Sequence, residues 1–207
     1  MSTIEILDTG TEPVIANQCP TNEIAVANWF LARAAEEGME LAPQVLQTLV
    51  QLAYGWYFVA YRDQLFMAVP VVQPQGPVLP SLDAFYPKPS SKVRVFQDDK
   101  VEVVDYQIEL PESELSKLSD TDRQQYLRTV ERIKMVLDVV WQKYKNIPAK
   151  ELVMYLQLKG TPWDRIVVQA GRDCLGVFIG HKAIQNYFLE FHEQAQKYQA
   201  ENQKNNE

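Results

Sequence analysis

Cysteine and histidine are scarce in this chain of 207 residues, which contains two of each. Cys19 and Cys174 are too far apart in the sequence to indicate a disulfide framework or a zinc cluster, so we expect both thiols to be reduced. His181 and His192 fall in the expected last helix, where ~1.5 Å per residue separates them by about 16 Å, too far to share a metal ion. The sequence therefore predicts no metal site and no cofactor.

The chain also lacks the short motifs on which many catalytic sites are built. It contains no GxSxG nucleophile elbow, no glycine-rich phosphate loop, no HExxH zinc motif and no CxxC pair. Asp98-Asp99 and Arg172-Asp173 are charged pairs, but both are more typical of polar turns than of acidic or basic sites. We therefore expect no catalytic residues, and a function in binding rather than in catalysis.

Positive charge is in deficit, because 20 lysines and arginines face 27 aspartates and glutamates and give a formal charge of −7. A protein that binds DNA or RNA directly is expected to carry a basic surface, so this balance argues against a nucleic-acid partner. An acidic chain fits a basic protein partner, or simple solubility.

A long apolar run and a leader sequence are missing too. The first ten residues have neither a basic segment nor an apolar core of the kind found in secretory signals. The most apolar stretch, Leu41–Ala60, is interrupted by Gln47, Thr48 and Gln51, whereas a membrane span needs ~20 predominantly apolar residues. We expect a cytoplasmic protein without a membrane partner.

What the chain does contain is a central helix, predicted for Pro43–Arg62. Proline suits the first turn of a helix because its missing N–H would be unpaired there. Apolar side chains follow at steps of three and four on two faces, which is typical of a helix covered on most sides. We expect one face to meet a helix over Glu23–Glu37 and the other to meet a long helix over Asp122–Tyr144.

Capping residues and hydrophobic period predict the remaining elements. Further helices are expected over Val78–Tyr86, from Pro148 to Gly160, and after Gly180. Extended or hairpin segments are expected at Leu65–Val72, Lys92–Leu110 and Val167–Ile179, with a turn at Thr161-Pro162-Trp163. The predicted fold class is α+β, mainly α: a compact helical domain with short β-hairpins. Residues 1–20 would be an irregular lead-in, 21–198 a single domain with a hairpin insertion at about 91–110, and 199–207 a frayed polar tail.

Two features allow both a structural and a binding interpretation. In the turn Gln73–Pro80, Gly76 and the prolines fit a requirement of backbone shape, which we favour, or a rigid loop that presents a binding surface. The large aromatic side chains of Trp56, Tyr57, Trp141 and Trp163 are more typical of a core, but any that is partly exposed becomes a candidate anchor for a partner.

Several motifs, in order and spacing, resemble one protein family. They are Ala-Asn-Trp-Phe-Leu at 27–31, Leu-x-Pro-x-x-Leu-Gln at 41–47, Ala-Tyr-Gly-Trp-Tyr at 53–57, Gly-Pro-Val-Leu-Pro at 76–80, Val-Trp-Gln-Lys-Tyr at 140–144, Ala-x-Glu-Leu at 149–152 and Thr-Pro-Trp at 161–163. Together they resemble the Panacea domain of SocA-like antitoxins and their phage-associated relatives. The sequence departs from the family pattern at Thr48, Gln51, Tyr54 and Gln75.

The resemblance implies a protein-binding function without catalysis. Proteins with this domain neutralise a cognate toxin by direct contact, and the SocA type also delivers its toxin to a protease. The acidic charge of this chain fits a basic toxin. The candidate partner-binding residues are Thr48, Gln51, Tyr54, Gln75, Gly76, Pro77 and Trp163. Two alternatives stay open: a scaffold or regulatory protein of a phage or mobile element, and, less favoured, an enzyme.

Overall fold

The computed structural model describes residues 19–86 and 107–204. In chain order the elements are α1 (Glu23–Glu36), α2 (Pro43–Tyr61), β1 (Val71–Gln73), β2 (Gly76–Val78), α3 (Pro80–Phe85), α4 (Glu112–Leu115), α5 (Asp120–Tyr144), α6 (Ala149–Met154), the 3-10 turn η2 (Tyr155–Gln157), α7 (Pro162–Ala170), the 3-10 turn η3 (Gly171–Cys174) and α8 (His181–Lys204). Over these described residues the protein is mainly helical with a small antiparallel sheet, which confirms the predicted fold class.

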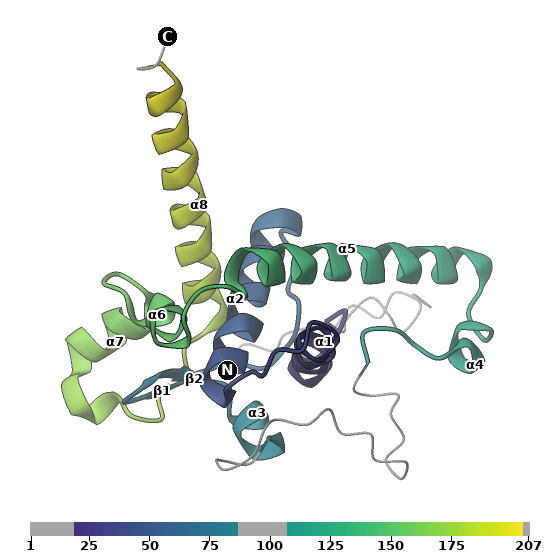
Figure 1. Ribbon diagram of the computed structural model, residues 1–207, viewed down its shortest axis with the longest axis horizontal. Helices are drawn as coiled ribbons and strands as arrows, with labels where there is room; N and C mark the ends of the chain where they lie inside the picture. Colours follow the sequence, from purple (N-terminus) through teal and green to yellow (C-terminus); the bar gives the residue numbers. More distant parts are fainter. Residues whose placement is uncertain (1–18, 87–106, 205–207) are drawn as a thin grey trace, which may run out of the picture.

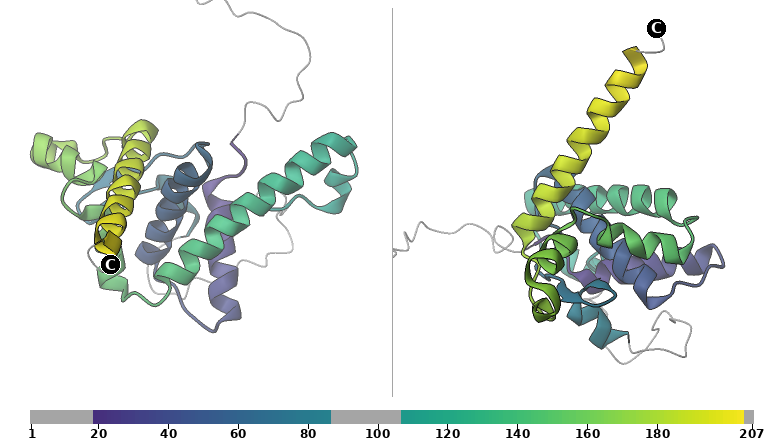
Figure 2. Two further views of the ribbon diagram at one scale, coloured as in Figure 1. Left: turned by 90° about the horizontal axis from the view of Figure 1, so that it is seen from above. Right: turned by 90° about the vertical axis from the view of Figure 1, so that its left-hand side faces the viewer.

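Helix α2 lies at the centre of the molecule (Figure 1). It packs against α1, α5, α6 and α8, and the side chains of Leu49, Val50 and Ala53 are fully buried. The predicted neighbours α1 and α5 are confirmed, whereas the contact with α8 was not foreseen. The views in Figure 2 show α5 extending away from the body on one side and α8 projecting from it in a different direction.

Local signals explain where the long helices begin. The side chain of Asn22 accepts a hydrogen bond from the N–H of Ala25 at the start of α1, and Ser119 does the same for Asp122 at the start of α5. Trp141 of α5 is completely buried, and its Nε1–H donates to Glu37 at 2.8 Å, beside the end of α1. These contacts fix α1 and α5 relative to each other around the core.

The strands β1 and β2 form a tight hairpin in which Val71 pairs with Val78 and Gln73 with Gly76. A third segment adds to β1 on its other side, since Val72 N–H donates to Val177 O and Ile179 N–H donates to Pro70 O. An extended segment was expected over Leu65–Val72. The strand β1 begins only at Val71, at the end of that range.

The expected hairpin over Val167–Ile179 and the expected turn at Thr161-Pro162-Trp163 are both wrong. Thr161 caps α7 by accepting a hydrogen bond from the N–H of Asp164, and Pro162 occupies the first turn of that helix. These strong start signals prevail over the β-branched residues that follow. The segment after η3 then pairs with β1 instead of folding back on residues 167–170.

Other boundaries differ as well. The helix expected from Pro148 to Gly160 ends at Met154 and continues only as η2, while α8 runs to Lys204 rather than fraying at 199. Most of the hairpin expected over Lys92–Leu110 lies outside the described residues, and 107–110 form no strand. Among the helices that the structure describes, none combines the length and the apolar character that crossing a bilayer would require.

Candidate protein-interaction site

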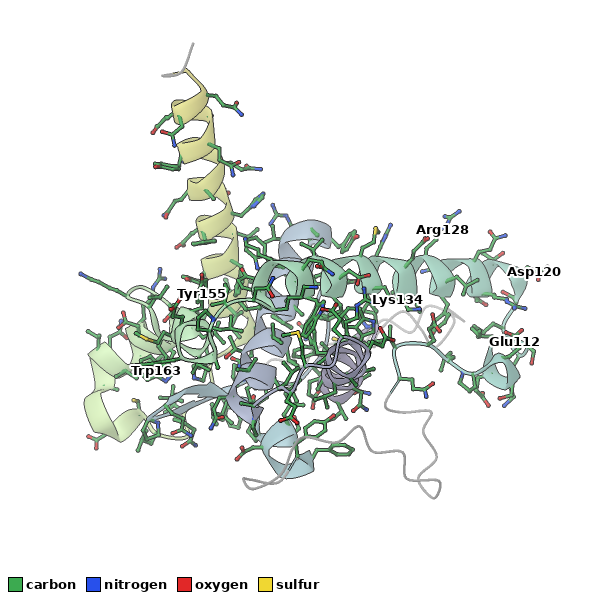
Figure 3. The ribbon with its side chains drawn as sticks, viewed as in Figure 1. Glu112, Asp120, Arg128, Lys134, Tyr155 and Trp163 are labelled. Carbon is green, nitrogen blue, oxygen red and sulfur yellow. The ribbon has the colours of Figure 1, made fainter. Side chains whose placement is uncertain are left out.

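The seven candidate partner-binding residues come from three parts of the chain, and the structure brings them together around the β1–β2 hairpin. Thr48, Gln51 and Tyr54 lie on α2, Gln75, Gly76 and Pro77 on the hairpin, and Trp163 on α7. Gln51 Nε2 donates to Pro77 O at 3.0 Å, and Trp163 Nε1–H donates to Gln73 O at 3.0 Å. Figure 3 shows Trp163 close to the hairpin, at the edge where α7 passes it.

Three candidate partner-binding residues form a strip along α2, and the structure buries all of them. Thr48, Gln51 and Tyr54 are 3%, 7% and 2% exposed. Thr48 Oγ1 donates to the carbonyl of Gln44 on its own helix, and Gln51 supports the hairpin. The physical reason is that the β2–α3 segment crosses this face of α2 and needs hydrogen-bond partners for its backbone, which the strip provides.

Gln47 is not among the candidate residues predicted from the sequence, but it holds the segment after the hairpin against α2. Its Oε1 accepts from Leu79 N–H at 2.9 Å and its Nε2 donates to Leu79 O at 3.1 Å, both in the interior. One side-chain amide therefore satisfies both backbone groups of a buried residue. The available signal was the pair of glutamines at i and i+4 on an otherwise apolar helix, Gln47 and Gln51.

Tyr54 continues the same strip toward α8. Its hydroxyl lies 2.6 Å from His181 Nδ1 and accepts a hydrogen bond from Gln185 Nε2 at 3.2 Å. Burial raises the pKa of the Tyr54 phenol above its ordinary value. Tyr54 is therefore a neutral, buried contact between α2 and α8, with no exposed surface to offer a partner.

At the tip of the hairpin, Gln75 is exposed while Gly76 is buried. Gly76 has a φ of +119°, which L side chains rarely adopt, and a Cβ there would lie 3.0 Å from Gln157 Nε2. The same Gln157 amide donates to Gln75 O at 2.8 Å. The glycine is thus required by backbone shape. Of the candidate residues, Gln75 is exposed and Pro77 and Trp163 are half-buried, so these three side chains can be reached by a partner.

Two neighbouring hollows lie at this surface. The larger, of about 330 Å³, is lined by Val71, Gln73, Gln75, Val78, Pro80, Asp83 and Ala84. The smaller, of about 30 Å³, is lined by Pro43, Gln44, Gln47, Thr48, Gln75, Pro77, Val78, Asp83, Val153 and Leu156. Of the described residues around the two hollows, Asp83 alone carries a charge, and the other polar groups are amides and a hydroxyl. This arrangement is suited to binding a polar or cationic group.

A third cavity, also of about 30 Å³, lies under the hairpin and is almost entirely apolar. Gln51, Tyr54, Pro77 and Trp163 are among the residues that line it. The volume is close to that of a single water molecule, far below the ~300 Å³ of a typical small-molecule site. Within the described ranges, no three histidine, cysteine, aspartate or glutamate side chains gather as a metal site would require.

The chain matches no protein-family model, and comparisons with curated proteins and with solved structures gave no match either.

Proposed function

We propose that this chain is a non-catalytic, protein-binding module of the antitoxin type, which neutralises a cognate toxin in the cytoplasm by direct contact. The observation that carries the proposal is a hollow of about 330 Å³ lined by the hairpin and α3, on a hairpin that α2 and α7 hold in place through Gln51 and Trp163. The buried members of the candidate set shape this surface, and the exposed Gln75 with Asp83 forms the part that contacts the toxin.

The charge of the surrounding segment favours a basic partner. Residues 19–86 contain six carboxylates, namely Glu23, Glu36, Glu37, Glu40, Asp63 and Asp83, against two cationic side chains, Arg33 and Arg62. Arg33 is itself engaged by Glu36 and Glu37. A negative field of this kind raises the rate at which a cationic partner associates and disfavours acidic ones.

Inside the hollow, the groups present fit a lysine or arginine side chain of the toxin. The carboxylate of Asp83 is the one charge among the described residues that line the hollow, and it attracts a cation. The amides of Gln73 and Gln75 can each donate and accept, so they suit the polar backbone around that cation. The hydrophobic rim of Val71, Val78 and Pro80 excludes water from the contact.

Asp83→Asn is expected to weaken the complex with the toxin about tenfold, which corresponds to about 1.4 kcal/mol, because it removes the charge in the hollow. The matched control is Glu193→Gln, which removes the same charge from an exposed position on α8, away from the hairpin. Co-expression of the chain with the product of each neighbouring gene, scored by growth rescue, identifies the toxin. Calorimetry with the purified pair then measures the affinity of both variants.

The outcomes separate the alternatives. Absence of rescue and of a complex with any neighbouring product would contradict the antitoxin function and favour a scaffold or regulatory role on a phage or mobile element. Rescue with equal affinity for the wild type and Asp83→Asn would keep the function but place the contact elsewhere than in this hollow.

A further inference from the structure

His181 is the first residue of α8 and lies in a closed network of neutral groups. Its Nδ1 is 2.6 Å from Tyr54 Oη, and its Nε2 is 3.0 Å from the carbonyl oxygen of Met67. Gln185 donates to the same Tyr54 hydroxyl, and Gln64 Nε2 lies 3.3 Å from His181 Nε2. The network joins α2, the connection that follows α2, and the base of α8.

The hydrogen bonds define the protonation state of the ring. A carbonyl oxygen can only accept, so the short contact with Met67 places the proton of the imidazole on Nε2. Nδ1 then carries a lone pair that accepts from the hydroxyl of Tyr54, and the same hydroxyl oxygen accepts from Gln185. Both contacts of the ring are satisfied as they stand while His181 is neutral, whereas protonation of Nδ1 requires the Tyr54 O–H to turn away.

Three features oppose a charged imidazole at this position. A proton on Nδ1 would point at the Tyr54 hydroxyl that now donates to it. The ring is half-buried and stacked on Tyr54, with centroids 5.3 Å apart, and burial lowers the pKa of His181 below its ordinary value. Finally, the first turn of a 24-residue helix carries the positive end of the helix dipole, which disfavours a cation.

The hydrogen bond to the Met67 carbonyl raises the pKa of His181, but less than burial lowers it, and no described group around the ring supplies a negative charge. Tyr54 from α2, Gln64 and the Met67 carbonyl from the connection after α2, and Gln185 from α8 are all uncharged. Cys19, on the segment before α1, lies near Gln64 and Tyr54, and burial raises the pKa of its thiol, which keeps it neutral. Asp63 acts on Cys19 and Tyr57, but no ion pair joins it to His181 in the described part of the chain, and the adjacent Lys182 is a like charge for an imidazolium.

The position of α8 determines the shape of a further groove in the molecule. A groove of about 290 Å³ lies between α8 and the connection from η2 to α7, with Leu158 on one wall and Tyr187 and Phe191 on the other. Leu158 and Phe191 are both about half exposed. Any movement of the base of α8 away from α2 therefore remodels this groove.

We propose that His181, Tyr54 and Gln185 form a pH-sensitive latch, which holds the base of α8 on α2 at neutral pH and releases it when the imidazole is protonated. The latch is independent of the proposed antitoxin function. Because the folded state disfavours the proton, the unfolded chain, with an ordinary histidine pKa of about 6.5, binds it first as the pH falls. The stabilisation is fully present above that pH and is lost as the pH falls through the lower folded-state pKa.

The sequence offers a sharp test, because His181 and His192 are its only histidines. In the wild type, NMR titration of the two imidazoles is expected to show His181 titrating below the ordinary range. Relative to the intrinsic exchange rate at each pH, hydrogen exchange at amides 184–192 of α8 should accelerate over the same pH interval. Exchange in α5 should stay slow on the same scale. In His181→Gln this acceleration should be absent, and in the matched control His192→Gln it should remain several-fold.

Tyr54→Phe gives an independent readout should the glutamine variant fail to fold. It removes the hydroxyl that donates to Nδ1 of the neutral ring, so the pKa of His181 should rise toward its ordinary value. An unchanged His181 titration in Tyr54→Phe, or the same pH-dependent exchange of α8 in His181→Gln as in the wild type, would overturn the latch. Glu37 also titrates at low pH, and hydrogen bonds from Lys145 and Trp141 lower its pKa. Its effect is the same in every variant, so it cannot cause a difference in α8 exchange between His181→Gln and the wild type.

Discussion

Replacing Gly55 by alanine is expected to force α8 away from α2 and to lower the free energy of unfolding by about 2–3 kcal/mol, the range of a severe overpacking. A Cβ at this position would lie 2.3 Å from Cε2 of Phe188. The Phe188 ring is 4% exposed and is held between Trp56 and Tyr187 through edge-to-face contacts, so it cannot rotate out of the way. The backbone of α8 must therefore move.

This expectation opposes simple helix propensity, which makes its sign informative. Alanine favours a helix interior over glycine by about 1 kcal/mol, so a stabilised Gly55→Ala variant would show that the Phe188 contact is not restrictive. Gly180→Ala is the matched control, because a Cβ there meets open space, and its effect should stay within about 0.5 kcal/mol. Urea denaturation measures all three proteins, and Phe188→Leu in the Gly55→Ala background should recover part of the loss, since leucine is smaller.

Replacing Gln47 by leucine is expected to cost about 2–4 kcal/mol and to loosen the hairpin. Leucine keeps most of the volume but removes both hydrogen bonds to Leu79, and each buried backbone group left unpaired costs roughly 1–3 kcal/mol. The control is Gln44→Leu, one turn earlier on α2, where the side chain is exposed and the change should be close to neutral. Denaturation measures the stability, and hydrogen exchange measures protection of the Leu79 amide.

The two measurements together make this prediction specific. Loss of stability with an unchanged, slow exchange at Leu79 would mean that Gln47 contributes through packing rather than through its amide. Because the same segment lines the surface proposed to contact the toxin, Gln47→Leu should also weaken that complex although the residue is buried and touches no partner.

The helices α1, α2 and α5 could be predicted from the sequence because their start signals and hydrophobic period agree. For α7 the two signals conflict: Ile166, Val167 and Val168 favour a strand, while Thr161 and Pro162 favour a helix start. The helix start prevails because its hydrogen bonds are local, whereas a strand there would need a neighbour. The segment that does pair with β1 lies after η3, and no local pattern indicates that choice.

For the candidate site, the sequence named the residues but did not predict their exposure. The prolines and glycine of the hairpin, together with the family resemblance, are the sequence features on which those residues were chosen. Whether Thr48, Gln51 and Tyr54 face solvent depends on what crosses α2, and that is decided by residues about 25 to 130 positions away in the sequence. A periodic pattern reports which side chains share a face, but it does not report what covers that face.

The glutamine contacts along β2 have a consequence for solubility and for the mode of recognition. Pro77 has no N–H to offer a further strand, its carbonyl is occupied by Gln51, and both backbone groups of Leu79 are occupied by Gln47. Two side chains of a helix thus take the place of the next strand of the sheet. This side of the hairpin is protected against the edge-to-edge pairing that leads to aggregation. A partner at β2 must therefore recognise the face of the hairpin through side chains, since strand addition along this edge is closed.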